Sequence, residues 1–85
     1  MIIDYTKSFT KQYKKLPVKV QNEFKYRLTI FAEDASKPML HHHALKGKKQ
    51  GFYSINISGD IRALYYKKGS NIIIFALIGT HSQLY

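Results

Sequence analysis

Three side chains in the second half of the chain are suited to acid–base chemistry on a phosphate group: His43, Arg62 and His81. A histidine can accept or donate a proton because the pKa of free imidazole is about 6.5, and a nearby phosphate anion raises it further. An arginine presents a planar fork of donors that fits two phosphate oxygens at once, which a lysine does not. These residues predict a site that binds and cleaves a phosphodiester.

Arg62 is one of only two arginines among the fourteen basic residues. Its place in a predicted strand would hold the guanidinium in a defined position. A surface ion pair with Asp60 or Glu33 is the alternative, and the residue types alone support the two interpretations about equally. The adjacent Gly59-Asp60 turn and the histidine at position 81 favour phosphate binding.

The run His41-His42-His43 raises the question of a metal site, because histidine-rich tracts can bind metal ions. Three adjacent residues of a loop rarely converge on one ion, and no cysteine or carboxylate pattern supplies a further ligand. We therefore expect neither a metal site nor a cofactor. His43 differs from the other two because it stands two residues before Leu45-Lys46-Gly47, whereas His41 and His42 are interpreted as loop residues.

His81 comes directly after the last predicted strand, where the chain leaves the sheet. Gly79 is expected to adopt a backbone conformation that other residues resist, and the hydroxyls of Thr80 and Ser82 to orient the imidazole. An exposed tail histidine is the alternative. Packing of the last two residues, Leu84 and Tyr85, is expected to anchor this tail.

The net charge of +9, from fourteen Lys and Arg against five Asp and Glu, is large for so small a surface. Such a field attracts polyanions, so nucleic acid, a ribosome or an acidic protein all fit as partners. For the lysines of the first third alone, a merely solvated helical face is about as well supported. The substrate-binding candidates are Lys46, Lys48, Lys49 and Tyr85, the last because an aromatic ring can stack on a base or instead cover the sheet edge.

A chain of 85 residues has room for one small core, and we expect a single domain over residues 1–85. It contains no cysteine, so disulfides and thiolate metal sites are excluded. The first residues lack the pattern of a signal peptide, and no run approaches the roughly 18 apolar residues of a membrane span. The expected location is the cytoplasm, with no membrane contact.

Two amphipathic helices are predicted before residue 34, separated by Pro17, which suits the first turn of the second helix. They follow a short opening strand around Asp4; the first helix is capped by Thr6 or Ser8, and the second runs to about Glu33. Their apolar positions are Phe9, Tyr13 and Leu16 in the first and Val20, Phe24, Leu28 and Phe31 in the second.

After a polar, mobile loop over residues 39–51, the pattern changes to that of strands. Alternation of period two predicts strands over 52–57 and 61–67, and the wholly apolar segment 72–78 predicts a strand covered on both faces. The expected fold class is α+β in the order β-α-α-β-β-β. A helical hairpin would pack on one face of a four-stranded, mostly antiparallel sheet.

Four short motifs in this order resemble the RelE/ParE superfamily of type II toxin–antitoxin toxins, and most of all its YafQ/RelE-like mRNA interferase branch. They are Leu45-Lys46-Gly47, Gly51-Phe52-Tyr53-Ser54-Ile55, Ser58-Gly59-Asp60-Ile61-Arg62 and Ile78-Gly79-Thr80-His81-Ser82-Gln83-Leu84-Tyr85. The resemblance implies a toxin that cleaves mRNA in the ribosomal A site and inhibits translation. It places His43, Asp60, Arg62 and His81 at positions of catalysis or phosphate binding, with Lys46 and Tyr85 as plausible additions.

The implied reaction is attack of a ribose 2'-oxygen on the adjacent phosphorus, without a metal. His43, assisted by Lys46, is assigned as base, Arg62 as phosphate clamp and His81 as acid, with Asp60 orienting a histidine; base and acid remain exchangeable. Some relatives carry an arginine where this chain has Leu77, which puts more weight on Arg62 and the lysines.

The partners that the resemblance implies are mRNA, the ribosome and an acidic, partly disordered antitoxin. Two alternatives remain open. One is a ParE-like inhibitor of DNA gyrase, against which the two histidines argue. The other is a catalytically decayed toxin that only binds its antitoxin or serves in a repressor.

Overall fold

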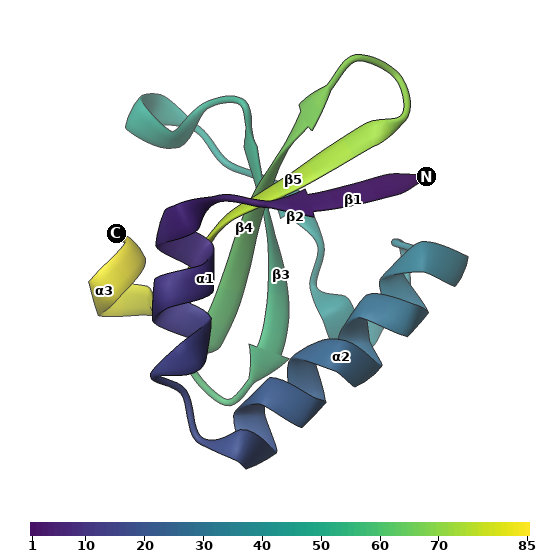
Figure 1. Cartoon of the computed structure of the whole chain (residues 1–85). Coiled ribbons are helices and arrows are strands. Elements are labelled where there is room, and N and C mark those ends of the chain that lie inside the picture. Colours follow the sequence, from purple (N-terminus) through teal and green to yellow (C-terminus); the bar gives the residue numbers. More distant parts are fainter.

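The computed structural model describes all residues from Met1 to Tyr85. One mixed sheet has the strand order β1-β5-β4-β3-β2, in which β1 pairs in parallel with β5 and all other neighbours are antiparallel. Three helices pack against it (Figure 1). The elements are β1 (Ile2–Tyr5), α1 (Lys7–Lys14), α2 (Val18–Glu33), β2 (His43–Ala44), β3 (Phe52–Ser58), β4 (Ile61–Lys68), β5 (Ile72–Thr80) and α3 (His81–Leu84), with 3₁₀ turns η1 (Pro38–Leu40) and η2 (Gly47–Lys49).

The predicted α+β class is confirmed, but the predicted strand count is wrong. The sheet has five strands rather than four, because His43 and Ala44 pair with Ser54 and Tyr53 at the edge of β3. This short β2 lies inside the segment predicted to be a loop. The same segment is held by Leu40, which is fully buried.

The two predicted helices start within a residue or so of the predicted boundaries, whereas the short α3 was not predicted. Thr6, not Ser8, caps α1, and its side-chain oxygen accepts a hydrogen bond from the Phe9 amide at 3.1 Å. Pro17 is the residue immediately before α2 rather than part of its first turn. The longest helix is α2, and no helix here is long and apolar enough to cross a membrane.

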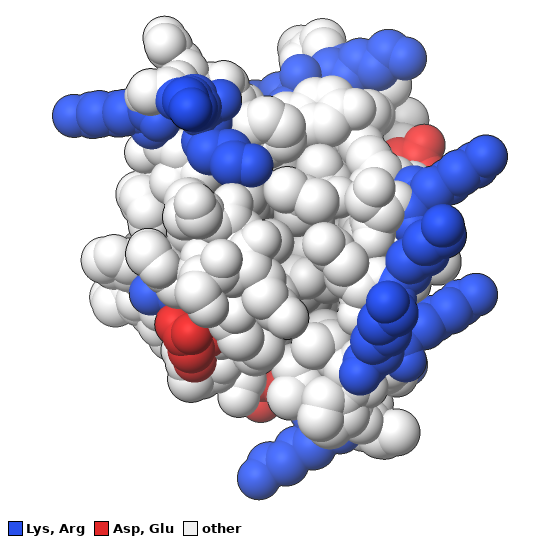
Figure 2. All heavy atoms as spheres, turned by 90° about the vertical axis from the view of Figure 1, so that its left-hand side faces the viewer, with Lys and Arg blue, Asp and Glu red and all other residues white.

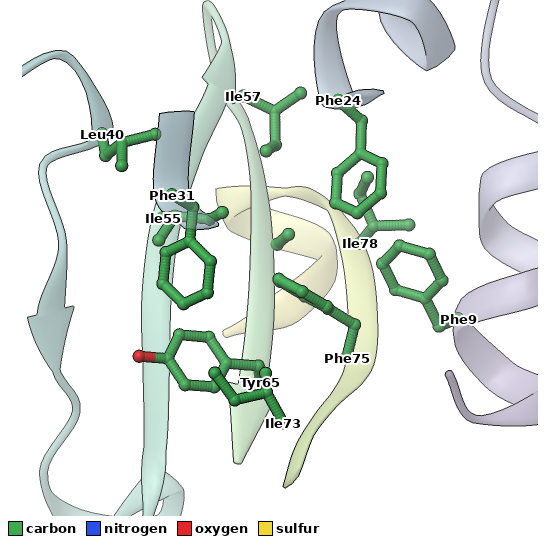
Figure 3. Packing of buried hydrophobic residues seen from close by; sticks show 11 residues of the cluster. Phe9, Phe24, Phe31, Leu40, Ile55, Ile57, Tyr65, Ile73, Phe75 and Ile78 are labelled. Carbon is green, nitrogen blue, oxygen red and sulfur yellow. The ribbon is translucent and has the colours of Figure 1, made fainter. Parts of the chain in front are cut away.

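The hydrophobic core lies between one face of the sheet and the two longer helices. The helices lie on different strands, α1 on β5 and α2 on β3, and diverge over the sheet (Figure 1). Their side chains still meet, because the ring centroid of Phe24 lies 5.3 Å from that of Phe9 and 5.6 Å from that of Tyr13. Figure 3 shows side chains from both helices meeting those of the strands, with Tyr65 and Phe75 near the middle, their ring centroids 5.5 Å apart. The core residues are Phe9, Phe24, Phe31, Leu40, Ile55, Ile57, Ala63, Tyr65, Ile73, Phe75 and Ile78.

The other side of the sheet, called the open face below, is covered only at one end. There α3 lies behind the strands in Figure 3, and its Leu84 is buried outside the core cluster. The apolar strand β5 lies between β1 and β4, as its sequence predicts. Beyond the end of β1, the side chains of Thr6 and Gln12 bind the backbone of β5. Thr6 Oγ1 donates to the Ala76 carbonyl at 2.7 Å, and Gln12 Oε1 accepts from the Ile78 amide at 2.9 Å.

Arg27 has a structural role that its place in a basic stretch did not indicate. Its side chain is only 18% exposed and pairs with Glu23 at 2.8 Å. Its Nη1 donates to the carbonyl oxygens of Met39 and Asn56. Arg27 therefore ties α2 to η1 and to the outer edge of β3.

His42, interpreted from sequence as a loop residue, is part of the packing. Its Nε2 lies 2.6 Å from the Tyr65 hydroxyl, and its ring stacks on Tyr53 and Tyr65 at 5.7 and 5.8 Å. Burial, with smaller contributions from Lys67 and His43, lowers the pKa of His42 below its usual value. Burial likewise raises the pKa of Tyr65 to about 12.

The lowered pKa of His42 predicts a loss of stability in acid. Below about pH 6.5 the unfolded chain protonates this histidine while the folded chain does not, so the free energy of unfolding falls as the pH drops towards the folded-state pKa. In thermal melts, we expect the Tm of His42→Gln to fall less between pH 7.5 and pH 5 than the Tm of the wild type does, each compared with its own value at pH 7.5. His41→Gln, which changes an exposed imidazole, should follow the wild-type profile; equal slopes for all three would refute the role of His42.

Candidate active site

The register of the sheet places His43 and Arg62 on the same face. His43 is opposite Ser54, and two residues further along β3 Asn56 is opposite Arg62, which in turn is opposite Gly79. Residues opposite each other across antiparallel strands point to the same side, as do residues two apart on one strand. Both side chains therefore belong to the open face, and strand spacing and rise put their Cα atoms about 12 Å apart.

Arg62 has hydrogen-bonding capacity that no protein group satisfies. Its side chain is 24% exposed, and its Nη1 is buried without a hydrogen-bond partner. Asp60 Oδ1 lies 4.0 Å from that nitrogen, too far for a hydrogen bond, and is itself 62% exposed. An unpaired donor on a charged group is costly, so this guanidinium is suited to receive an anion.

Asp60 was predicted to orient a histidine, and the structure places it differently. Its one ion pair is the long contact with Arg62, and no histidine forms an ion pair with it. Asp60 follows Gly59, which takes a positive φ of 50° in the turn between β3 and β4. The turn therefore directs this carboxylate towards the guanidinium.

Asn56 is a polar residue of the site that the sequence reasoning did not single out. Its carboxamide oxygen is buried without a partner, whereas its amide nitrogen is neither buried nor hydrogen-bonded. It stands directly across from Arg62. The signal was present in the sequence, because Asn56 alternates with Ile55 and Ile57 and so lies on the polar side of its strand.

His43 is held in one tautomer by the backbone of its neighbour. Its Nδ1 lies 2.8 Å from the carbonyl oxygen of His41, and a carbonyl can only accept, so Nδ1 carries the hydrogen. The neutral ring then has its lone pair on Nε2. His41 adopts a left-handed conformation, with φ of 44°, at the end of η1, and this turn aims the carbonyl at His43.

His81 is the first residue of the single-turn helix α3. Thr80 accepts a hydrogen bond from the Gln83 amide at 3.2 Å, and Gln83 Oε1 accepts one from the Thr80 amide at 2.8 Å. The Thr80 hydroxyl therefore caps the helix instead of orienting the imidazole, and Ser82 Oγ lies 3.4 Å from Thr80 Oγ1. The ring of Tyr85 packs on the imidazole of His81, with 4.6 Å between the ring centroids.

Of the two tail residues that were predicted to anchor the end of the chain by packing, only one is buried. Leu84 is buried, as expected, but Tyr85 remains 48% exposed. One ring of the pair formed by Tyr85 and His81 is thus free to meet a ligand. Both side chains are exposed beside the end of β5.

Gly79 is required for space rather than for an unusual backbone conformation. Its φ is not positive, in contrast to the prediction. A Cβ at this position would lie 2.7 Å from Gln83 Oε1, the atom that completes the cap of α3. A side chain at position 79 would displace Gln83 and with it the turn that carries His81.

Gly79→Ala should therefore lower stability by about 1 kcal/mol, the value of one hydrogen bond, because it displaces Gln83 Oε1 from the Thr80 amide. For a domain of this size the corresponding fall in Tm is about 4–8 °C. A double-mutant cycle with Gln83→Ala tests the cause: in that background the alanine at 79 should cost almost nothing further. Additive losses would show that Gly79 acts through another contact.

The predicted lysines lie around η2, before the start of β3, and Arg62 pairs with Asn56 near the other end of that strand. Lys46 and Lys48 are exposed and Lys49 is half-buried, around η2, and neither salt bridge of the molecule involves a lysine. Figure 2 views the molecule from the side of α1 and α3, with Lys and Arg in a row along the margin where α1 lies and in a second group at the upper left. Acidic side chains occupy only small areas of this view.

Arg62 occupies the middle of the arrangement. His43 is on β2, two strands away, and His81 follows β5, one strand away on the other side. Such a set of side chains can bind a phosphodiester on Arg62, with one imidazole on each side.

Comparison with known proteins identifies the family. Residues 1–85 match the family of bacterial toxins of type II toxin–antitoxin systems described as YafQ. The chain belongs to the YafQ toxin family. The resemblance to YafQ-like toxins that the motifs indicated is thereby confirmed, and the chain is a toxin of a type II toxin–antitoxin system. Curated proteins gave no significant match.

Solved structures of toxins share this fold. YafQ from E. coli is 21% identical with a TM-score of 0.82, covering 98% of this chain and 96% of its own. In the E. coli DinJ–YafQ toxin–antitoxin complex the values are 22%, 0.78, 98% and 94%. A metal-bound toxin from Helicobacter pylori is 25% identical with a TM-score of 0.75, covering 100% and 99%. In the present structure no three histidine, aspartate or glutamate side chains come together as a metal site.

Proposed function

We propose that this YafQ-family toxin is a ribosome-dependent endoribonuclease that cleaves mRNA without a metal ion. The observation that carries the proposal is Arg62, whose buried Nη1 has no partner and which stands between His43 and His81. A phosphate of the RNA supplies the missing acceptor. The resemblance of the sequence motifs to those of mRNA interferases supports mRNA in the ribosomal A site as the substrate.

The reaction requires a base, an acid and stabilisation of a pentacoordinate phosphorus. His43 Nε2, whose lone pair is left free by the bond from Nδ1 to the His41 carbonyl, takes the proton from the ribose 2'-hydroxyl. The 2'-oxygen attacks phosphorus while the bond to the 5'-oxygen breaks, and His81 donates a proton to that oxygen. The products are a 2',3'-cyclic phosphate and a 5'-hydroxyl end.

Two donors hold the phosphate in this scheme. Arg62 binds one non-bridging oxygen, and the accessible amide of Asn56 across the strand pair binds the other. Asp60 contacts Arg62 and so positions the guanidinium rather than a histidine. Tyr85 stacks on a base, and the substrate backbone runs past Lys46, Lys48 and Lys49.

The partners in this proposal are mRNA, the ribosome and an antitoxin. The family membership supports the antitoxin, and the net charge of +9 favours an acidic one. Neutralising that charge would also weaken contacts with RNA.

Primer extension on a defined mRNA with translating ribosomes tests the proposal, comparing the wild type with His81→Ala. We expect discrete in-frame cuts that disappear in the variant, at equal Tm, because the His81 side chain is exposed and its hydrogen bond with the Tyr85 amide is made by the backbone carbonyl. Cuts that persist in His81→Ala would remove the acid assignment. Intact mRNA with the wild type would contradict the nuclease and leave gyrase inhibition or a decayed toxin.

A further inference from the structure

A small cavity lies where α1 and α3 both meet the edge of β5 (Figure 1). Strand β1 pairs with β5 only as far as Phe75, so beyond that residue this edge of the sheet has no neighbouring strand. The cavity, called the edge cavity below, has a volume of about 360 Å³. Its lining residues are Gln12, Lys15, Leu16, Ile78 and Gln83. None of the residues assigned to cleavage lines it, although Gln83 belongs to the same helical turn as His81.

The carboxamide of Gln12 has its oxygen engaged and its nitrogen free. Gln12 Oε1 accepts a hydrogen bond from the Ile78 amide at 2.9 Å. A backbone amide can only donate, so the atom that it meets is the oxygen and the other atom is the NH2 group. That nitrogen is neither hydrogen-bonded nor buried. Gln12 therefore lines the edge cavity with a donor that no protein group uses.

Gln83 and Lys15 add further unused donors. Gln83 Oε1 accepts from the Thr80 amide at 2.8 Å as part of the cap of α3, which leaves its Nε2 without a hydrogen bond. Lys15, the residue that ends α1, is exposed and belongs to neither ion pair of the molecule. Two carboxamide NH2 groups and one ammonium group thus belong to the lining of one cavity, and all three can only donate.

The acceptors next to the cavity are already used. At the end of α1, the Gln12 carbonyl accepts from the Lys15 amide at 3.2 Å. The Tyr13 carbonyl accepts from the Leu16 amide at 3.1 Å, and the Leu16 carbonyl from Gln21 Nε2 at 3.2 Å. No aspartate or glutamate lines the cavity. A ligand bound here meets donors, so it must bring the acceptors itself.

A phosphate group has the chemistry that such a lining requires. Its non-bridging oxygens only accept hydrogen bonds, and its charge complements the ammonium group of Lys15. A metal cation would find no free acceptor and would be repelled by that lysine. A second copy of this chain would bring another net charge of +9. The edge cavity is therefore suited to an anion.

The position of the edge cavity relative to Arg62 makes RNA the source of that phosphate. Arg62 is on β4, opposite Gly79 of β5, and the cavity lies on the other side of β5, where β1 has ended. Two strand spacings put the Cα atom of Arg62 about 10 Å from that line. His81 and Gln83 share one helical turn, so an RNA chain that continues from Arg62 past His81 arrives at the cavity.

We propose that the edge cavity binds a backbone phosphate of the RNA on the 3' side of the cleaved bond. Lys15 pairs with the charge of this phosphate, and the amide nitrogens of Gln12 and Gln83 donate to its non-bridging oxygens. The 3' side follows from the role of His81 as acid, because the 5'-oxygen that it protonates belongs to the 3' nucleotide. The inference therefore rests on the proposed function, to which it adds a second phosphate-binding position.

Glutamate at either glutamine removes the donor and keeps the local fold. In Gln12→Glu a carboxylate oxygen can still accept from the Ile78 amide, and Gln83→Glu supplies the glutamate that a capping box commonly has. Each variant also places a negative charge where the phosphate is proposed to bind. Asn22→Asp is the matched control, since it makes the same change of charge at an exposed residue of α2 that does not line the cavity.

The probe is a short single-stranded 2'-O-methyl RNA, which cannot be cleaved because it lacks the attacking hydroxyl. In NMR titrations of the wild type, the side-chain NH2 signals of Gln12 and Gln83 should shift, and that of Asn22 should not. We expect Gln12→Glu and Gln83→Glu to keep the wild-type Tm and to weaken RNA affinity about tenfold, against about twofold or less for Asn22→Asp. No shift at either glutamine up to millimolar RNA, or equal losses in all three variants, overturns the proposal.

Neutralising single phosphates locates the one that the cavity binds. Methylphosphonates at successive positions of the same RNA remove one charge each, and double-mutant cycles then pair each phosphate with a side chain. Arg62→Lys should couple to one phosphate, and Lys15→Ala to another on its 3' side, with a salt slope smaller by about 0.7. Lys14→Ala, the neighbouring lysine outside the cavity, should couple to neither. Coupling of Lys15 to no phosphate, or to one on the 5' side, overturns the proposal.

Failure of the nuclease and failure of the edge cavity give different results. RNA that couples to Lys15 in a toxin that cleaves no mRNA on ribosomes would refute the nuclease and leave the phosphate site. Discrete cuts on ribosomes together with unmoved signals of Gln12 and Gln83 would refute the phosphate site and leave the nuclease.

Discussion

Replacing Arg62 by lysine should lower the rate of mRNA cleavage by about 10²- to 10³-fold, the usual loss when one pre-organised donor to a developing charge is removed. The charge is retained, but a lysine lacks the planar fork that binds two oxygens at once. The buried, unpaired Nη1 also has no counterpart in lysine. Single-turnover cleavage on programmed ribosomes, which separates the chemical step from binding, measures the effect.

The other arginine of the chain is the matched control for this substitution. Arg27→Lys removes the hydrogen bonds to Met39 and Asn56 and should lower Tm, with no change in rate per folded molecule. Arg62→Lys should keep the wild-type Tm and lower the rate per folded molecule. Full activity in Arg62→Lys would show that any cation suffices at this position.

His43→Gln should reduce the cleavage rate by about 10²- to 10⁴-fold, the range for loss of a general base. Glutamine can still donate a hydrogen bond to the His41 carbonyl, so β2 should keep its place, but it takes up no proton at neutral pH. The rate at saturating ribosomes should fall much more than binding.

The backbone around His43 provides the control for that experiment. His41→Asn keeps the carbonyl acceptor, and asparagine tolerates the left-handed conformation at this position. It should retain wild-type cleavage. If His41→Asn and His43→Gln lose activity equally, the loop and not the imidazole is what cleavage requires.

The long, periodic elements of the fold were predictable from sequence. Helix α2 ends at Glu33 as expected, because four apolar residues at helical spacing define its buried side over its whole length. The wholly apolar segment before Gly79 predicted a central strand for the same reason. Both signals arise from burial repeated over many residues, which a sequence records directly.

Features that depend on a partner elsewhere in the chain were not predictable. Strand β2 has two residues, too few for a period, and exists only through its pairing with β3. Gly79 was assigned a backbone role because the side chain of Gln83 that occupies its space is visible only after folding. Asp60 likewise was assigned to a histidine although the turn aims it at Arg62.

Side chains of the same type proved to have opposite roles. His42 is stacked between core tyrosines and the loop, whereas its neighbour His43 faces the other side of the sheet with Nε2 free. Adjacent residues of an extended segment point to opposite faces, so sequence proximity did not group them. In the same way, Arg27 stabilises the fold through hydrogen bonds, whereas Arg62 belongs to the candidate site.

The parallel pairing of β1 with β5 determines when the toxin can complete its fold during its own synthesis. Ile2 to Tyr5 lie against Ile72 to Phe75, so the first strand has no neighbour until nearly the whole chain has been made. Contacts this distant in sequence form late, and His81 emerges from the exit tunnel later still. A nascent chain therefore cannot finish its sheet, or position His81 at the end of β5, until the residues of β5 have left the exit tunnel.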